Sequence, residues 1–133
     1  MALGITKPLN TVKESSLVLI DSYAGLARQR YLTTVPGQDI SYATKLEEAK
    51  AYIAAGYPSD TSPYPWVALE AAATGDTPAD RADFIIATAN YWNTKGAEIE
   101  AARIAGKQNV NAATTTAAVY AITQTTKITL ETI

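Results

Sequence analysis

The residues from Thr77 to Val110 form the longest stretch with the pattern of one continuous helix, and they constrain the fold more than any other segment. Apolar or small residues recur along this stretch at spacings of three and four, which places them on one helical face. Large and small side chains alternate on that face, and they are Ala82, Ile85, Ala89, Trp92, Gly96, Ile99, Ala102, Gly106 and Val110. The stretch therefore predicts a seam against which other helices pack.

The start of this helix is also marked in the sequence. Gly75 can end a preceding helix in a left-handed conformation, and the hydroxyl of Thr77 can cap the next one. Pro78 then suits the first helical position, where no amide donor is required. Nearby carboxylates favour the positive end of the helix dipole, and they are Asp76, Asp80 and Asp83.

Three shorter helices are predicted before the long one, at about residues 14–33, 41–55 and 66–74. The first has an apolar stripe of Leu17, Ile20, Ala24, Ala27 and Tyr31, and the second has one of Tyr42, Leu46, Ala49 and Ile53. A short connection should make these two helices antiparallel neighbours. The segment 57–65 contains three prolines, which predicts an ordered loop.

Extended arms are expected on both sides of a helical domain that covers residues 14–113. In residues 1–13, Leu3 and Ile5 alternate with small or polar residues, and Pro8 opposes helix formation. This arm is either a disordered tail or a segment that becomes ordered against a neighbour. Residues 114–133 are rich in threonine, and Ile128 and Leu130 fall on one side of an alternating pattern, which predicts a strand. Such a strand would pair with the first arm or with the sheet edge of another chain.

The composition is that of a folded domain and excludes several kinds of site. Of the 133 residues, 47% are apolar and 18% are charged, and the net charge of −2 comes with scattered basic residues, which argues against nucleic-acid binding. Cysteine and histidine are absent, which excludes disulfides, thiolate or imidazole metal sites and a serine triad with a histidine base. We expect no cofactor and no metal. The first residues lack a signal-peptide pattern, and no apolar run is long enough to span a membrane.

The residues that could carry chemistry have simpler structural explanations. The sequence Ala105-Gly106-Lys107 resembles part of a phosphate loop but lacks the other required positions. The aspartates near Thr77 match no calcium-loop spacing. Glu70 could be a buried acid, but no partner for acid-base catalysis can be identified. We therefore expect that the protein is not an enzyme.

The two tryptophans suggest contacts with other molecules. Trp92 lies on the seam and is expected in the core. Trp66 follows the proline-rich loop, next to Tyr64, and could lie either in the core or in an interface. An aromatic surface of this kind could also bind sugars, so a small carbohydrate-binding module or enzyme is a further, less favoured interpretation.

Short motifs spread over about residues 17–113 resemble a helical module of tail-region proteins in tailed bacteriophages. The first are Asp21-x-x-Ala24-x-x-x-Arg28-x-x-Tyr31-x-Thr33-x-x-Pro36-Gly37-Gln38 and Tyr42-x-x-Lys45-x-x-Glu48-Ala49-x-x-Tyr52. Gly56-Tyr57-Pro58, Tyr64-Pro65-Trp66, Glu70-Ala71-x-Ala73-Thr74-Gly75, Trp92, Ile99-Glu100-Ala101-Ala102-Arg103 and Lys107 complete the resemblance. The resemblance implies a structural or assembly role in a phage tail, without catalytic residues.

Together these observations predict a mainly α fold, a small antiparallel bundle of three main helices and one short helix with extended arms. The expected function is that of a virion structural protein of the tail or baseplate, located in the virion and, during assembly, in the host cytoplasm. Its partners would be other tail proteins and copies of itself, without nucleic acid or membrane. The alternative is a tail or tail-fibre assembly chaperone that is absent from the virion. The predicted partner-binding residues are Leu3, Ile5, Tyr64, Trp66, Ile128 and Leu130.

Overall fold

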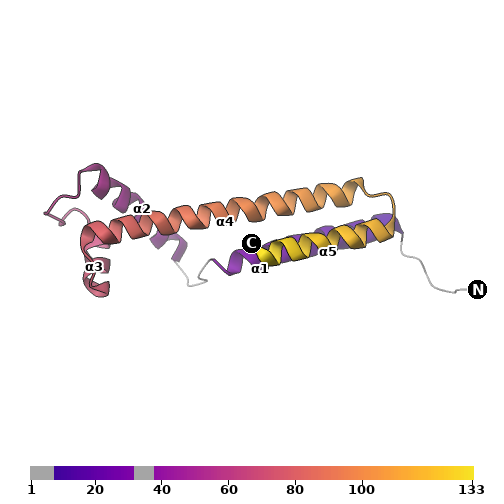
Figure 1. The fold of residues 1–133 in the computed structure, drawn as a ribbon, viewed down its shortest axis with the longest axis horizontal. Coiled ribbons are helices and arrows are strands. Elements are labelled where there is room, and N and C mark those ends of the chain that lie inside the picture. Colours follow the sequence, from indigo (N-terminus) through magenta and orange to yellow (C-terminus); the bar gives the residue numbers. More distant parts are fainter. Residues whose placement is uncertain (1–7, 32–37) are drawn as a thin grey trace, which may run out of the picture. The chain divides into compact units, whose positions relative to one another are not determined.

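The computed structural model describes residues 8–31 and 38–133, and over those residues the chain forms α-helices and no β-strand (Figure 1). The helices are α1 (Leu9–Gln29), α2 (Gln38–Ala54), α3 (Pro65–Thr74), α4 (Pro78–Ala112) and α5 (Thr116–Thr132). The predicted mainly α fold is confirmed.

The chain divides into two compact units. Unit 1 consists of residues 1–32 and 95–133, and unit 2 consists of residues 33–94. The long helix α4 contributes to both, since Ile99 and Val110 are buried in unit 1, whereas Ala82 and Ile85 are buried in unit 2. The predicted seam is buried at both ends of α4 but exposed at Gly96 between them, and it contributes to separate cores. The first two helices contribute to different clusters, α1 to those of unit 1 and α2 to that of unit 2.

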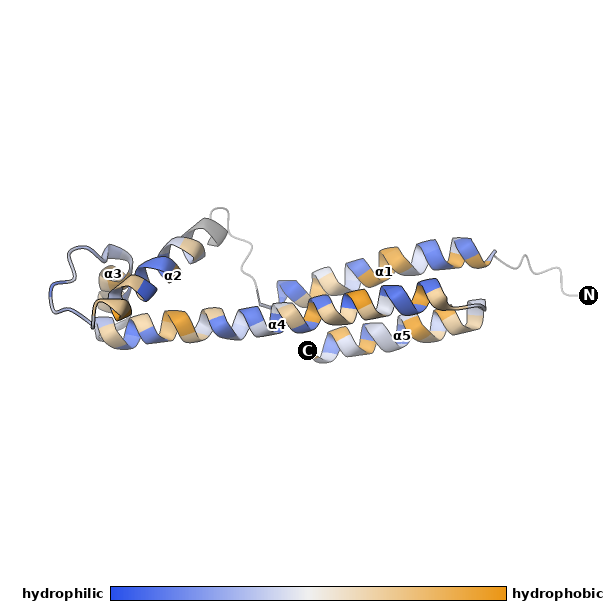
Figure 2. Ribbon diagram, turned by 90° about the horizontal axis from the view of Figure 1, so that it is seen from above, coloured by the Kyte–Doolittle hydropathy of each residue, from blue (hydrophilic) through white to orange (hydrophobic). Residues whose placement is uncertain are grey.

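Unit 1 contains α1, α5 and the C-terminal part of α4. Val12 near the start of α1 shares a cluster with Val119 near the start of α5, and Ala27 near the end of α1 shares one with Leu130. The helices α1 and α5 therefore run in the same direction, and Figure 1 shows them side by side. Figure 2 shows short apolar and polar stretches alternating along these helices, as expected for amphipathic helices.

Small side chains fill much of the core of unit 1. Ala24 and Ala27 are fully buried in α1, and Gly106 of α4 lies directly against Thr126 of α5. The buried hydroxyls of Thr123 and Thr126 donate to backbone carbonyl oxygens four residues earlier in the same helix, at 2.7 and 2.8 Å. Threonine can be buried here because its hydroxyl needs no partner outside the helix.

The predicted C-terminal strand is wrong, because residues 116–132 are helical. Thr115 caps the helix, with its side-chain oxygen accepting a hydrogen bond from the amide of Ala118 at 3.1 Å. Val119 and Leu130 then lie buried against α1. Packing of this face outweighs the β-propensity of the threonines.

The prediction of an extended arm over residues 1–13 is also wrong in part. Helix α1 begins at Leu9, so residues 9–13 are helical, and Val12 belongs to the core. Pro8 stands directly before the helix, where its missing amide donor is not needed. The predicted contact residues Leu3 and Ile5 lie outside the described residues.

Unit 2 contains α2, α3 and the N-terminal part of α4. Its core consists of Ala49, Tyr52, Val67, Ala82 and Ile85. Several predicted local features are confirmed here. Gly75 has a φ of 80°, the hydroxyl of Thr77 accepts a hydrogen bond from the amide of Asp80 at 3.1 Å, and α4 begins at Pro78.

The connection between α2 and α3 is held by hydrogen bonds. The amide of Tyr57 donates to the carbonyl of Tyr52 at 3.2 Å around Gly56, whose φ is 83°. The hydroxyl of Tyr52 donates to the carbonyl oxygen of Pro58 at 3.1 Å, and Asp60 accepts from the amide and hydroxyl of Ser62. These bonds fix the path of the chain into α3.

Candidate interaction surface

The short helix α3 presents apolar side chains to the outside of unit 2. Leu69 is 71% exposed, and Trp66, one helical turn earlier, is also exposed. Pro65, Trp66, Leu69 and Glu70 line an open hollow. We call Pro65, Trp66 and Leu69 the α3 surface. Large exposed apolar groups that lie together on a helix are typical of sites that bind other proteins.

Buried residues on the opposite side hold α3 in place. Val67 and Ala71 are almost fully buried, and Val67 packs with residues of α2 and α4. Glu48 of α2 accepts a hydrogen bond from the amide of Val67 at 3.1 Å. This amide belongs to the first turn of α3, so a side chain from another helix caps its positive end. Burial raises the pKa of Glu48, against the opposing effect of its hydrogen bonds with the amides of Val67 and Trp66.

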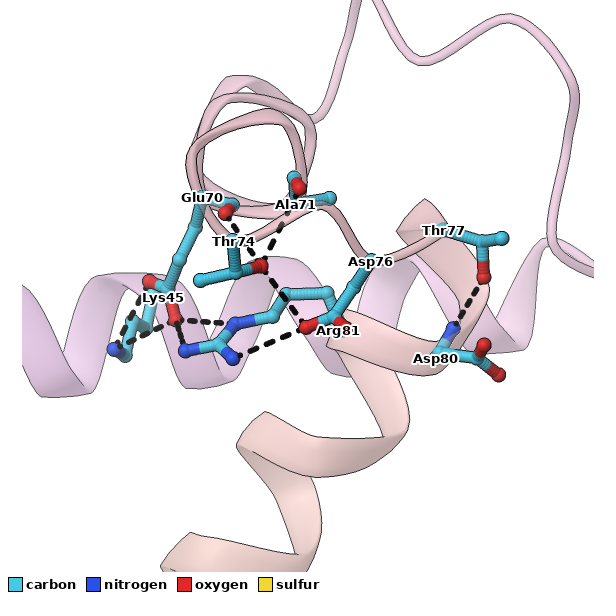
Figure 3. A network of polar contacts seen from close by, with 8 residues as sticks. All are labelled: Lys45, Glu70, Ala71, Thr74, Asp76, Thr77, Asp80 and Arg81. Carbon is cyan, nitrogen blue, oxygen red and sulfur yellow. Dashed lines mark hydrogen bonds and ion pairs between the residues drawn. The ribbon is translucent and has the colours of Figure 1, made fainter.

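An ion-pair network lies beside the α3 surface (Figure 3). The carboxylate of Glu70 accepts hydrogen bonds from Lys45 of α2 at 3.0 Å and from Nε of Arg81 of α4 at 2.7 Å. Arg81 also reaches Asp76 at 3.3 Å, and Asp76 accepts from the hydroxyl of Thr74. Burial alone would raise the pKa of Glu70, but the bonds from Arg81 and Lys45 outweigh it and hold that pKa below its usual value.

This network ties together all three helices of unit 2. Two cations, Lys45 and Arg81, face two carboxylates, Glu70 and Asp76, so the charges balance within the group. The guanidinium of Arg81 also lies 4.5 Å from the ring centroid of Phe84, which is exposed. The charged groups of this network are thus paired with one another, which leaves apolar contacts as the main means of binding at the α3 surface.

The structure separates the predicted partner-binding residues. Trp66 is exposed, and Tyr64 is half-buried with its ring 5.1 Å from that of Tyr52, so both belong to the approach to α3. Ile128 and Leu130 belong to unit 1 instead. Ile128 is half-exposed, whereas Leu130 is fully buried and has no surface left for a partner.

Other residues singled out in the sequence have structural partners. Trp92 is half-buried and stacks edge-on against Tyr42, with ring centroids 4.5 Å apart. Gly106 is buried against Thr126, and Lys107 pairs with Asp21 at 2.9 Å. Asp83 accepts a hydrogen bond from the hydroxyl of Tyr57 at 2.8 Å. Within residues 8–31 and 38–133, no group of three or more acidic side chains is arranged to hold a metal ion.

Several residues around the surface were not found by sequence reasoning. Lys45 and Glu48 lie off the apolar stripe predicted for their helix, but each contacts α3. Arg81 was not singled out, although it joins Glu70 to Asp76. A charged residue that bonds to a different helix leaves no local spacing signal, and only the position of Leu69 one turn after Trp66 could have been noticed.

Comparison of the chain with protein-family models, with curated proteins and with solved structures finds no match. The helices of the described segments were also considered as membrane spans. None of them combines the length and the apolar character that crossing a bilayer requires.

Proposed function

We propose that this protein is a structural component of a bacteriophage tail or baseplate that joins larger tail proteins. The motifs over residues 17–113 that resemble the tail-region module support this setting. The observation that carries the manner of binding is the α3 surface, where Trp66 and Leu69 are exposed on a helix fixed by two other helices. A preorganised apolar surface loses little conformational entropy when a partner covers it.

The proposed contact differs from the one expected from the sequence. Addition of a C-terminal strand to a neighbour's sheet is withdrawn, because that segment is helical. The α3 surface replaces it as the main site of partner binding. Trp66 would act as the anchor, because large aromatic side chains contribute most to the binding energy of protein interfaces.

The test is to purify particles made with the wild-type chain and to quantify the protein by mass spectrometry. A fixed, stoichiometric copy number is expected. A second preparation would carry the double variant Trp66→Ala, Leu69→Glu, and a third the control Ile104→Glu, which alters an exposed residue of unit 1.

The double variant should be folded but depleted from particles, while the control should be incorporated as the wild type is. Absence of the wild-type chain from particles that nevertheless need it for assembly would refute the proposal and favour the assembly chaperone. Normal incorporation of the double variant would refute the role of the α3 surface.

A further inference from the structure

A second apolar surface lies on the outer side of α1 in unit 1. Val18 and Leu26 are 65% and 58% exposed, and Leu19 is exposed between them. With their small neighbours they follow the spacing of three and four that defines one helical face. We call this face the α1 stripe, and it consists of Ser15, Val18, Leu19, Ser22, Gly25 and Leu26.

Three of the four charged residues of α1 form bonds with residues of α4. Asp21 pairs with Lys107 and Arg103 of α4, at 2.9 and 3.0 Å. Arg28 pairs with Glu100 of α4 at 2.6 Å, and Lys13 donates to the carbonyl oxygen of Asn111. The fourth, Glu14, is exposed at the edge of the stripe, four residues before Val18. The stripe itself contains only apolar and small uncharged residues, so its own positions bring no like charges together when two copies meet.

No contact within the chain requires glycine at position 25. A β-carbon added at Gly25 would meet no atom within 4 Å, and the residue lies inside a helix, where glycine is unfavourable. Glycine at this position leaves room for a neighbouring helix to come close. Gly106, by contrast, is required by a contact inside unit 1.

From these observations we infer that the α1 stripe binds a second copy of this chain, with the two α1 helices antiparallel about a two-fold axis near Ser22. This arrangement places Val18 of each copy near Gly25 of the other, and Leu19 near Leu26. Large side chains then face a gap left by glycine, as in close helix packing.

The size of the available surface fits a dimer. Lys127 of α5 lies 5.7 Å from the ring centroid of Tyr23 in α1, so this side of α5 adjoins α1. Tyr120 stands seven residues earlier, on the same side of α5, and is exposed. Two adjacent helices, about 30 Å long and about 10 Å wide each, offer roughly 600 Å², close to the ~800 Å² that one partner buries in a stable interface.

The inference rests on the proposed function only in that a phage tail would bring several copies of the chain together. It can be tested on the isolated full-length protein by sedimentation equilibrium. The wild type should dimerise, and Leu26→Glu should weaken dimerisation by at least about tenfold. The variant Ile104→Glu, which alters an exposed residue of α4, should dimerise as the wild type does. Circular dichroism should show unchanged helicity in both variants.

Cysteine cross-linking tests the geometry, because the natural chain has no cysteine. The variant Ser22→Cys should form a disulfide-linked dimer readily under mild oxidation, since the two sulfur atoms meet at the axis. Gln29→Cys lies on the same face but about 20 Å from its copy in an antiparallel pair, so it should react slowly. Ala101→Cys, on the exposed side of α4, is the matched control.

A wild type that stays monomeric, together with Ser22→Cys cross-linking no faster than the controls, would overturn the inference. Faster cross-linking of Gln29→Cys than of Ser22→Cys would overturn the antiparallel arrangement. A chain that dimerises in this way but is absent from particles would refute the proposed function and leave the dimer standing. A chain that is present in particles at a fixed copy number, but that neither dimerises nor cross-links through Ser22→Cys, would overturn the inference and leave the proposed function standing.

Discussion

The side chain of Thr126 occupies the space that a β-carbon on Gly106 would need. Such a β-carbon would lie 2.6 Å from Cγ2 and 2.7 Å from Oγ1 of Thr126. Thr126 cannot turn away freely, because it is buried and its hydroxyl donates to the carbonyl of Ile122 at 2.8 Å. The close approach of α4 to α5 therefore depends on glycine at this position.

Gly106→Ala should consequently destabilise the protein by about 1–3 kcal/mol, although alanine favours a helix over glycine by about 1 kcal/mol. The free energy of unfolding in urea, followed by circular dichroism, measures this change. Gly96→Ala is the control, because a β-carbon at Gly96 meets nothing within 4 Å and should leave stability equal or higher. Adding Thr126→Ala to Gly106→Ala should restore part of the loss. A Gly106→Ala protein as stable as the wild type would contradict the close contact.

Substitutions in α5 distinguish a helix from a strand directly. Leu130 is fully buried whereas Ile128 is 50% exposed, so Leu130→Ala should cost about 2–5 kcal/mol and Ile128→Ala less than about 1 kcal/mol. Residues two positions apart would share one face in a strand, and the two losses would then be similar. Equal losses in urea unfolding would therefore contradict the helix.

The ion pairs of Glu70 should make stability depend on pH. Its pKa in the folded protein lies below the ordinary value of 4.5, so the ionised form stabilises the fold above about pH 4.5, and this contribution is lost as the pH falls through the folded-state pKa. Glu70→Gln should lower stability at pH 7 by about 1–3 kcal/mol, and the difference from the wild type should shrink towards acid pH.

Unfolding curves measured at a series of pH values give this difference. Glu47→Gln is the control, since Glu47 is exposed and pairs with the exposed Lys50 at 3.5 Å, so the change should have little effect. If the loss caused by Glu70→Gln were the same at pH 3 and pH 7, ionisation of Glu70 would not be its source.

Arg30 and Tyr31 should hold the last turn of α5. Arg30 donates to the carbonyl oxygen of Leu130 at 2.6 Å, and the hydroxyl of Tyr31 donates to that of Ile133. A cation at this position also suits the negative end of the helix dipole. Arg30→Ala should weaken hydrogen-exchange protection at residues 129–133 by about 1 kcal/mol. Residues 116–120, at the other end of α5, serve as the internal reference, and equal loss at both ends would contradict a local effect.

The helices that could be predicted are those whose packing faces contain conventional apolar residues. The seam of α4 shows its period through residues such as Ile85, Ile99 and Val110, all of which are buried. Its start could be predicted because the signals at Gly75, Thr77 and Pro78 are local. The division of that seam between two cores could not be predicted, because the apolar face of a helix does not specify which other helix packs against it.

Helix α5 was missed because threonine was counted as a strand residue. Val119, Thr123, Thr126 and Leu130 are spaced by four, three and four, which is a helical face if threonine is allowed in the core. The hydroxyls of Thr123 and Thr126 bond to carbonyls within the helix, which removes the usual penalty of burying a hydroxyl without a partner. Thr115, within the segment predicted as a strand, is the cap of the helix.

The candidate surface was predictable only in its aromatic part. Trp66 and Tyr64 stand out beside the prolines, and both lie where α3 begins. The residues that make the surface rigid do not stand out, because Glu48 and Lys45 come from a different helix and act across 19 and 25 residues of sequence. Contacts of that kind become visible only when the fold is known.

The division into units also sets the order in which the chain can fold during synthesis. Unit 2 is continuous in sequence, so its core residues emerge from the ribosome close together in time. Helix α1 emerges earlier but finds its partner α5 much later, since Arg30 and Leu130 are 100 residues apart. At a synthesis rate of about 5–20 residues per second, the apolar face of α1 stays uncovered for several seconds before α5 is made. Unit 2 therefore folds first, and α1 is the segment most exposed to chaperones or to premature pairing with another nascent copy.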